Sequence, residues 1–185
     1  MSRVFLSRVL AALCALSLLT TPVLADNGYL KDFGADFDGV TKKMNDLADA
    51  IPADKYGWAL TDEVFTVSES LVHVAMANFF LCQALGVPMP EDVAALGQEA
   101  QEKVTAKKDV MALLARSQDQ VRKAHGIVAG GDLGEEIQLF GGTRSKRGVF
   151  MTIAGHNHEH LGNLIAYARS NRVVPPWSRP QGDDE

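Results

Sequence analysis

Cysteine is scarce in this sequence, which has only Cys14 and Cys82 among its 185 residues. Cys14 lies in an N-terminal segment that we expect to be removed, and the single remaining thiol excludes an internal disulfide. Cys82 lies within an apolar helical pattern, which favours a small buried hydrophobe over a reactive thiol. The fold must therefore rest on a hydrophobic core. The 46% apolar and 22% charged residues are ordinary for one globular domain.

Positive charge is also in short supply. The 18 Lys and Arg residues are outnumbered by 23 Asp and Glu residues, which gives a formal net charge of −5. Removal of residues 1–25 would remove Arg3 and Arg8 and no acidic residue, so the mature chain would carry −7. Proteins that bind phosphate backbones depend on clustered Lys and Arg. We therefore expect no nucleic-acid partner.

No apolar run is as long as the ~20 residues needed to span a bilayer. The run from Val9 to Leu19 follows two arginines and precedes Val23-Leu24-Ala25. A basic start, a short apolar stretch and small residues at the cleavage point are typical of a secretory signal peptide. We predict a signal peptide over residues 1–25, cleaved after Ala25. The expected product is periplasmic or secreted, with no membrane association after cleavage.

Alternation of apolar and polar residues, which would indicate strands, is absent at useful length, and there is no internal repeat. Apolar residues instead recur in steps of three and four from Leu30 to Ile51. This spacing predicts an amphipathic helix. Pro52 ends it, because proline disfavours helical geometry at the preceding residue. Residues 52–66 are predicted to be a linker that crosses one end of a bundle.

A second helix opens with a capping-box pattern formed by Thr66 and Glu69. The helix is apolar nearly all round up to Gly86, so we expect it to be the central, buried element. His73 lies within it.

A third, more exposed helix is predicted from about Glu99 to Ile127 and a fourth from about Ser145 to Asn171. The glycines between them predict a loop, namely Gly126, Gly130, Gly131, Gly134, Gly141 and Gly142. The apolar seam of the fourth helix is Val149, Ile153, His156, His160, Asn163 and Tyr167. Together the segments predict an all-α four-helix bundle over residues 26–178, followed by a disordered tail over residues 179–185.

The most informative pattern is a histidine pair. His156 and His160 are four residues apart, so on a helix they share a face, at a spacing that lets two imidazoles reach one ion. Both occupy seam positions, and we expect them to point into the bundle towards His73. Three clustered imidazoles would all need buried partners, which a divalent metal would supply. A satisfied polar cluster without metal is the alternative.

We therefore predict a three-histidine metal site with at least one position open to water. Imidazole suits zinc, nickel, iron or copper; we favour zinc or nickel. Glu159, three residues after His156, is a weak candidate for a general base, and a solvated surface carboxylate is the favoured interpretation. His158 points about 200° away round the helix and is excluded from the site. Asn163 could bond in the pocket or serve packing, and His125 is predicted to be a favourable charge at a helix C-terminus.

These residues resemble the DinB-like family of four-helix-bundle proteins. The resemblance covers nearly the whole mature chain and rests on the residues from Val67 to His73, from His156 to Leu164 and from Val173 to Trp177. Family members carry one ligand histidine early in the second helix and two, four apart, in the fourth, which implies His73, His156 and His160. In family members the last ligand is usually followed by a basic residue, glycine and glutamine, whereas this chain has Leu161-Gly162-Asn163.

The better-understood relatives are implied to use the metal with a small cellular thiol, as transferases or isomerases. Small thiols are chiefly cytosolic, so export argues for a different reaction. Three hypotheses follow: a metal-dependent enzyme with a small-molecule substrate, of transferase or hydrolase type; a non-catalytic metal-binding bundle; and a metal-free bundle that binds another protein. The sequence names no substrate and leaves a homodimer open.

Overall fold

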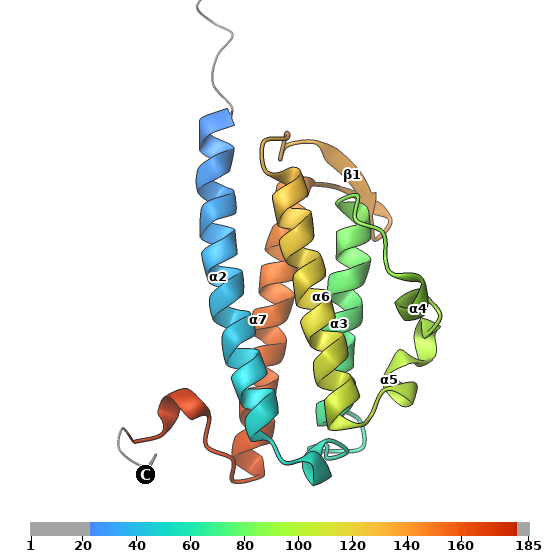
Figure 1. Ribbon diagram of the computed structural model, residues 1–185, viewed down its shortest axis with the longest axis vertical. Helices are drawn as coiled ribbons and strands as arrows, with labels where there is room; N and C mark the ends of the chain where they lie inside the picture. The colour runs from blue at the N-terminus through green and yellow to red at the C-terminus, as the bar shows by residue number, and fades with distance from the viewer. Residues whose placement is uncertain (1–22, 181–185) are drawn as a thin grey trace, which may run out of the picture.

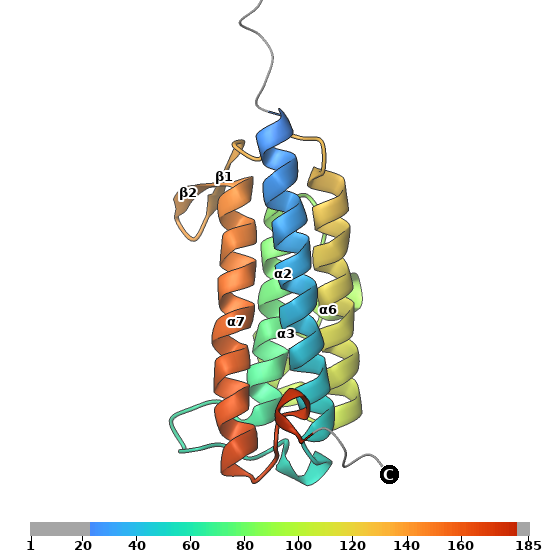
Figure 2. The same ribbon diagram turned by 90° about the vertical axis from the view of Figure 1, so that its left-hand side faces the viewer.

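The structure is a computed structural model that describes residues 23–180. Four long helices, α2 (Val23–Ala50), α3 (Val67–Ala84), α6 (Lys107–Val128) and α7 (Lys146–Ser170), run side by side (Figures 1 and 2). This confirms the predicted all-α four-helix bundle. The shorter elements are η1 (Ala53–Lys55), α4 (Glu91–Ala94), η2 (Gly97–Glu99), α5 (Ala100–Lys103), β1 (Glu136–Leu139), β2 (Gly142–Ser145) and η3 (Pro176–Ser178).

Helix α3 is positioned by the predicted capping box. The backbone N–H of Glu69 donates to Thr66 Oγ1 at 3.2 Å, and the backbone N–H of Thr66 donates to Glu69 Oε2 at 2.7 Å. Both bonds satisfy donors that a helix start leaves without partners. Helix α7 begins similarly, with Ser145 Oγ accepting from the backbone N–H of Gly148 at 3.1 Å. The start of each helix that carries a candidate ligand is thus fixed by its own sequence.

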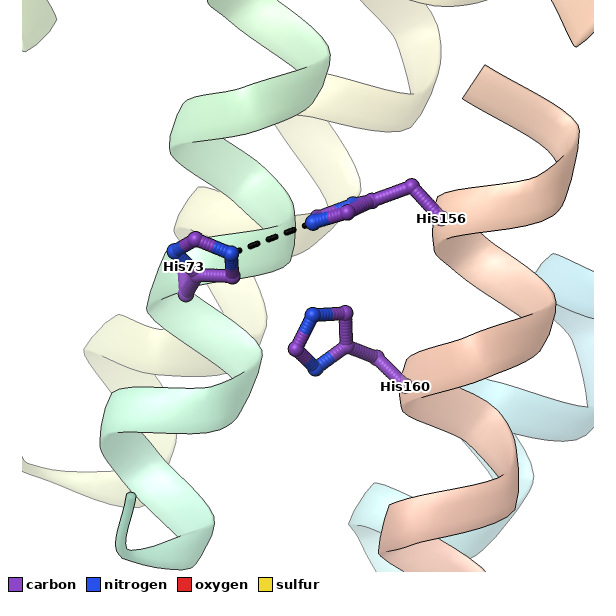
Figure 3. Close-up of side chains that lie close together, drawn as sticks. All are labelled: His73, His156 and His160. Carbon is purple, nitrogen blue, oxygen red and sulfur yellow. Dashed lines mark hydrogen bonds between the residues drawn. The ribbon is translucent and has the colours of Figure 1, made fainter. Parts of the chain in front are cut away.

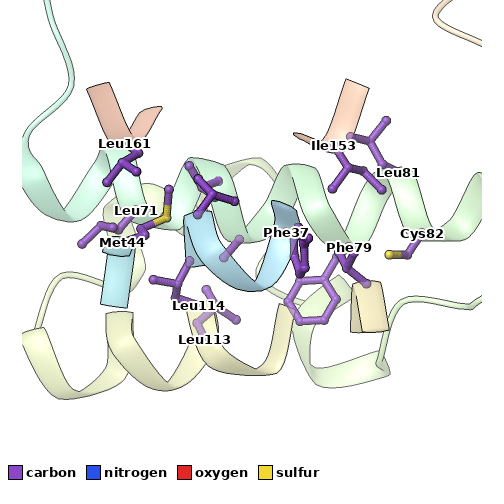
Figure 4. Packing of buried hydrophobic residues seen from close by; sticks show 14 of the residues in the cluster. Phe37, Met44, Leu71, Phe79, Leu81, Cys82, Leu113, Leu114, Ile153 and Leu161 are labelled. Atoms are coloured by element: carbon purple, nitrogen blue, oxygen red, sulfur yellow. The ribbon is translucent and has the colours of Figure 1, made fainter. Parts of the chain in front are cut away.

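The core lies between the four helices, with α3 packed on α6 and α7, and α2 packed on the same two helices. Figure 4 shows side chains from all four helices meeting there, among them Met44, Phe79, Leu114 and Ile153. Cys82 belongs to this core and is fully buried. Its burial confirms the expected small buried hydrophobe, and burial also raises the pKa of its thiol to about 12.

The predicted third helix is wrong at its N-terminal end. Helix α5 ends at Lys103, and α6 begins only at Lys107. Between them the backbone leaves helical geometry, with φ −110° and ψ 87° at Val104. The break allows separate anchoring: Gln101 Nε2 donates to the Glu69 carbonyl at 3.2 Å, and Lys107 Nζ donates to the Ile51 carbonyl at 3.0 Å. Tertiary contacts override a helical pattern that continues across the break.

The predicted glycine loop also needs correction. Gly126 lies inside α6, and β1 and β2 form an antiparallel hairpin in which Leu139 pairs with Gly142. Its two turn residues, Phe140 and Gly141, have φ of 54° and 73°, the left-handed geometry that two-residue hairpins favour. Each strand has only four residues, which is too short for the alternation to stand out in the sequence.

Residues 52–66 cross one end of the bundle as predicted (Figure 1). Tyr56 is buried beneath this connection, where its hydroxyl donates to the Ala48 carbonyl at 2.8 Å. After α7 the chain turns back, and Lys43 Nζ of α2 lies 5.8 Å from the ring centroid of Trp177. The segment after α7 therefore includes the short helix η3, packed against α2.

The predicted signal peptide falls mostly on residues 1–22, which lie outside the described residues, as do residues 181–185 of the predicted tail. Helix α2 begins at Val23, so cleavage after Ala25 would remove three residues of its first turn. The first core side chain described in α2 is Leu30, so this cleavage would leave the described core complete. Among residues 23–180, no helix is both long and apolar enough to cross a membrane.

Candidate metal centre

Helices α3 and α7 bring His73, His156 and His160 together, as the sequence predicted (Figure 3). The Nε2 atoms of His156 and His73 are 3.1 Å apart. The ring centroid of His160 lies 4.5 Å from that of His156 and 4.9 Å from that of His73. One ring nitrogen from each histidine lies within 4.8 Å of the other two. We call this group the histidine cluster.

The cluster lies beside the core rather than within it. The side chains of α7 that are buried in this region are Ile153, Asn157, Leu161 and Leu164. His156 and His160 are only half-buried, and Asn163 is exposed. His156, His160 and Asn163, which were predicted to lie on the seam, therefore lie towards the edge of the buried face, where α7 faces α3. This position leaves the histidines accessible.

Hydrogen bonds orient two of the rings. His160 Nδ1 lies 3.3 Å from Ser70 Oγ, and Figure 3 shows the other nitrogen of that ring directed towards His73 and His156. Among the described residues, His156 Nδ1 is buried without a hydrogen-bond partner. An unpaired buried polar atom costs about 1–3 kcal/mol and is characteristic of functional sites.

The surroundings of all three imidazoles lower their pKa values and so favour the neutral form that a metal ligand requires. Burial is the main cause in each case. Together with the neighbouring His160 and His73, it lowers the pKa of His156 from 6.5 to about 4. The pKa values of His73 and His160 are lowered too, and the negative charge of Glu159 partly opposes both shifts.

The donor set fits a divalent metal. Two nitrogens at 2.0–2.1 Å from one ion in tetrahedral geometry lie about 3.3 Å apart, close to the 3.1 Å between His156 Nε2 and His73 Nε2. Ser70 supplies the partner that a ligand histidine commonly has on its other nitrogen. His73, His156 and His160 would be the ligands.

The remaining sequence candidates lie outside the cluster. Glu159 is exposed and acts on the histidines only through its charge. His158 Nε2 lies 3.0 Å from Asp36 Oδ2 on α2, which confirms its exclusion from the site. His125 lies in the last turn of α6, where its Nε2 is 2.8 Å from the Leu30 carbonyl and its ring stacks on Phe33. It serves packing between helices in addition to its position at the helix end.

Sequence reasoning missed a chain of buried polar groups behind the cluster. Asn157 Nδ2 donates to Asn78 Oδ1 at 2.9 Å, and Asn78 Nδ2 donates to Ser117 Oγ at 3.3 Å. The chain joins α7, α3 and α6 through the core. The available signal was Asn78, a polar residue in the middle of a helix that is otherwise apolar nearly all round.

Two cavities adjoin the histidine cluster. The first, of about 600 Å³, has His73 and His156 in its wall. The second, of about 420 Å³, has His160, Ser70 and Asn163 in its wall. The Phe65 ring, on the side of the second cavity, lies 5.3 Å from the His73 ring. The cluster can therefore be approached by small molecules from two sides.

The fold and the site define a four-helix bundle with a three-histidine cluster open to small molecules. The family model of the DinB superfamily matches residues 36–164, a span that includes all three histidines. The chain belongs to the DinB superfamily, which confirms the resemblance seen in the sequence. A comparison with curated proteins found no match.

Proposed function

We propose that this protein is a divalent-metal-dependent enzyme whose ligands are His73, His156 and His160, with zinc or nickel as the favoured metal. One observation carries the proposal: three imidazoles converge from two helices, and a cavity opens directly onto two of them. A purely structural site would be closed by protein ligands. The adjoining cavities therefore favour an enzyme over a non-catalytic metal-binding bundle.

The residues around the cluster would prepare the reaction. A bound divalent ion would supply a Lewis acid that lowers the pKa of a coordinated water or thiol. Ser70 would hold the His160 ring in one orientation through its 3.3 Å contact with Nδ1. Burial lowers the pKa of each imidazole, which would reduce competition between protons and a metal for the ligand nitrogens.

The proposed reaction is transfer to, or hydrolysis of, a small molecule by a nucleophile generated at the ion. No carboxylate belongs to the histidine cluster within residues 23–180. Glu159 is exposed, so we assign it an electrostatic influence on His73 and His160 rather than a proton-transfer role. The nucleophile would then depend on the ion for activation, which suits water or a thiol.

We further propose that the enzyme works outside the cytoplasm, supported by the signal-peptide pattern over residues 1–25. Its net negative charge supports a small-molecule substrate over nucleic acid. N-terminal sequencing of protein from the extracytoplasmic fraction should find Asp26 as the first residue. Recovery of the intact chain from the cytoplasm alone would overturn this part of the proposal.

Metal analysis of protein purified without an affinity tag tests the site itself. We expect about one equivalent of metal in the parent and a large loss in the His156→Ala, His160→Ala variant. His158→Ala is the matched control, because it removes an imidazole from the same helix outside the cluster. Metal content that stays unchanged in the double variant, or falls equally in the control, would refute the site.

A further inference from the structure

We propose that the cavity of about 600 Å³ binds the uncharged, apolar body of the substrate, an aromatic or acyl group, with a polar head group placed at the histidine cluster. The head-group part rests on the proposed function. The apolar part rests on the walls of the cavity alone. We call this cavity the apolar pocket.

Most of the pocket wall is hydrocarbon, thioether or aromatic ring, including Met76, Ala77, Phe80, Leu81, Met89 and Phe140. Its polar side chains besides the histidines are Gln83, Gln98 and Thr152, and none of its lining residues within 23–180 is an Asp, Glu, Lys or Arg. The Thr152 hydroxyl already donates to the Gly148 carbonyl at 2.9 Å. A charged ligand group would lose hydration here without gaining a counter-charge, so the pocket selects a neutral body.

The pocket has the size and adaptability for such a body. Cavities of about 300–1,000 Å³ hold small organic ligands, with apolar walls and a few polar groups that fix orientation. Met76 and Met89 contribute flexible thioethers, which adapt to irregular apolar shapes. His73 and His156 lie in one wall, so the head group of a bound molecule would meet the cluster there.

The second cavity provides an internal contrast. Its wall also has apolar residues, namely Leu60, Val64, Phe65, Ala166 and Tyr167, but it differs from the first in holding a carboxylate, Glu63, beside Ser70, Asn163 and His160. The negative charge and the hydrogen-bonding groups suit water or a polar co-substrate. The two sides of the histidine cluster thus differ in chemistry, which assigns the apolar body to the first.

The turn of the β1–β2 hairpin supports the assignment. Phe140 lies in the pocket wall with its ring 5.6 Å from that of Phe80, yet the residue is 65% exposed. It also adopts φ 54°, a conformation that is unfavourable for a bulky residue. A large apolar side chain kept exposed and strained at a cavity mouth is poorly explained by stability and well explained by contact with a ligand.

The first experiment titrates the metal-free protein with N-phenyl-1-naphthylamine, a neutral fluorescent dye. We expect saturable binding and at least a tenfold loss of affinity in Ala77→Phe, which places a ring inside the pocket. Ala166→Phe is the matched control, because the same substitution there places a ring in the second cavity and should change dye affinity less than twofold. Met89→Trp offers a second way to fill the pocket if Ala77→Phe fails to fold.

No dye binding by the folded parent, or equal losses in the two alanine variants, would overturn the proposal. If Phe140→Asn changes the oligomeric state and leaves dye affinity unaltered, the exposed phenylalanine serves a second copy instead, which also counts against it. Because no metal is present, these outcomes are independent of the proposed enzyme function.

The second experiment uses the zinc-loaded protein and straight-chain hydroxamic acids from acetyl to octanoyl, whose head group binds metals. We expect affinity to rise with chain length, by up to about fourfold for each buried methylene. Ala77→Phe should abolish the rise and leave acetohydroxamate affinity intact. Affinity that is independent of chain length would overturn the proposed orientation. Failure of every hydroxamate with normal dye binding would count against the metal site alone.

Discussion

The buried polar chain behind the histidine cluster gives the sharpest test of how the fold positions the site. Asn157 is fully buried, and its Nδ2 donates to Asn78 Oδ1 at 2.9 Å and to the Ile153 carbonyl at 2.8 Å. Replacement by leucine keeps the branched shape and the number of side-chain heavy atoms but removes both bonds. Asn78 Oδ1 would then be buried without this donor.

The expected loss of stability follows from the buried Asn78 Oδ1, which loses its hydrogen-bond donor. A buried acceptor that loses its donor costs about 1–3 kcal/mol, whereas Asn157 Oδ1 has no partner among the described residues and its removal costs nothing comparable. We expect Asn157→Leu to lower the free energy of unfolding by about 2 kcal/mol. For a domain of this size that corresponds to a fall in Tm of about 4–8 °C.

Denaturant melts and a double-mutant cycle measure the effect. In Asn78→Leu the Ser117 hydroxyl still donates to the Leu114 carbonyl at 2.7 Å, so this second substitution does not leave that hydroxyl without a hydrogen bond. The double variant should be more stable than the sum of the singles predicts, by about 1–2 kcal/mol. Asn163→Leu, exposed on the same helix, is the control and should change stability by less than about 0.5 kcal/mol. Additive single effects would refute the reasoning.

Three further predictions concern the cluster and its surroundings. Ser70→Ala should weaken zinc binding by about 10–100-fold in a chelator competition assay, because His160 Nδ1 loses its partner; Thr152→Val should not, because its hydroxyl bonds the Gly148 carbonyl. The metal-free protein should lose stability as pH falls from 6.5 to about 4, because His156 binds a proton in the unfolded chain at a higher pH than in the folded protein. Thermal melts of His156→Ala should show a smaller loss of stability over this pH range, and an identical loss would contradict the assignment. Phe140→Asn should raise the free energy of unfolding by about 0.5–1 kcal/mol, because Asn-Gly suits the left-handed turn, and should weaken dye binding; a variant that is less stable would show that the phenylalanine is not strained.

The sequence predicted the features that follow from spacing. Steps of three and four located α2 and α7, and the Thr66–Glu69 box gave the start of α3 to the residue, because capping is a local interaction. The i,i+4 spacing of His156 and His160, with His73 on the apolar helix, predicted the cluster for the same reason.

Features decided by contacts between distant segments were not predictable. The break before Lys107 depends on an acceptor at the end of α2, some fifty residues earlier. The hairpin is too short for its period to be seen in the sequence. In the structure α7 turns Asn157 towards α3, where its amide bonds Asn78, and the histidines lie at the edge of the buried face. The apolar spacing of the sequence predicts those histidines on the seam, whereas the Asn157–Asn78 bond joins residues that are far apart in the chain.

That rotation has a functional consequence. Had His156 and His160 occupied the core positions that Asn157 and Leu161 fill, they would be closed off by the other helices, as in a structural site. At the α3–α7 edge the imidazoles keep enough burial to favour the neutral form, yet they border a cavity on each side. We therefore infer that the Asn78–Asn157 bond helps to hold the cluster at this edge. Asn157→Leu should accordingly weaken zinc binding as well as stability, whereas a variant that loses stability at unchanged zinc affinity would separate the two.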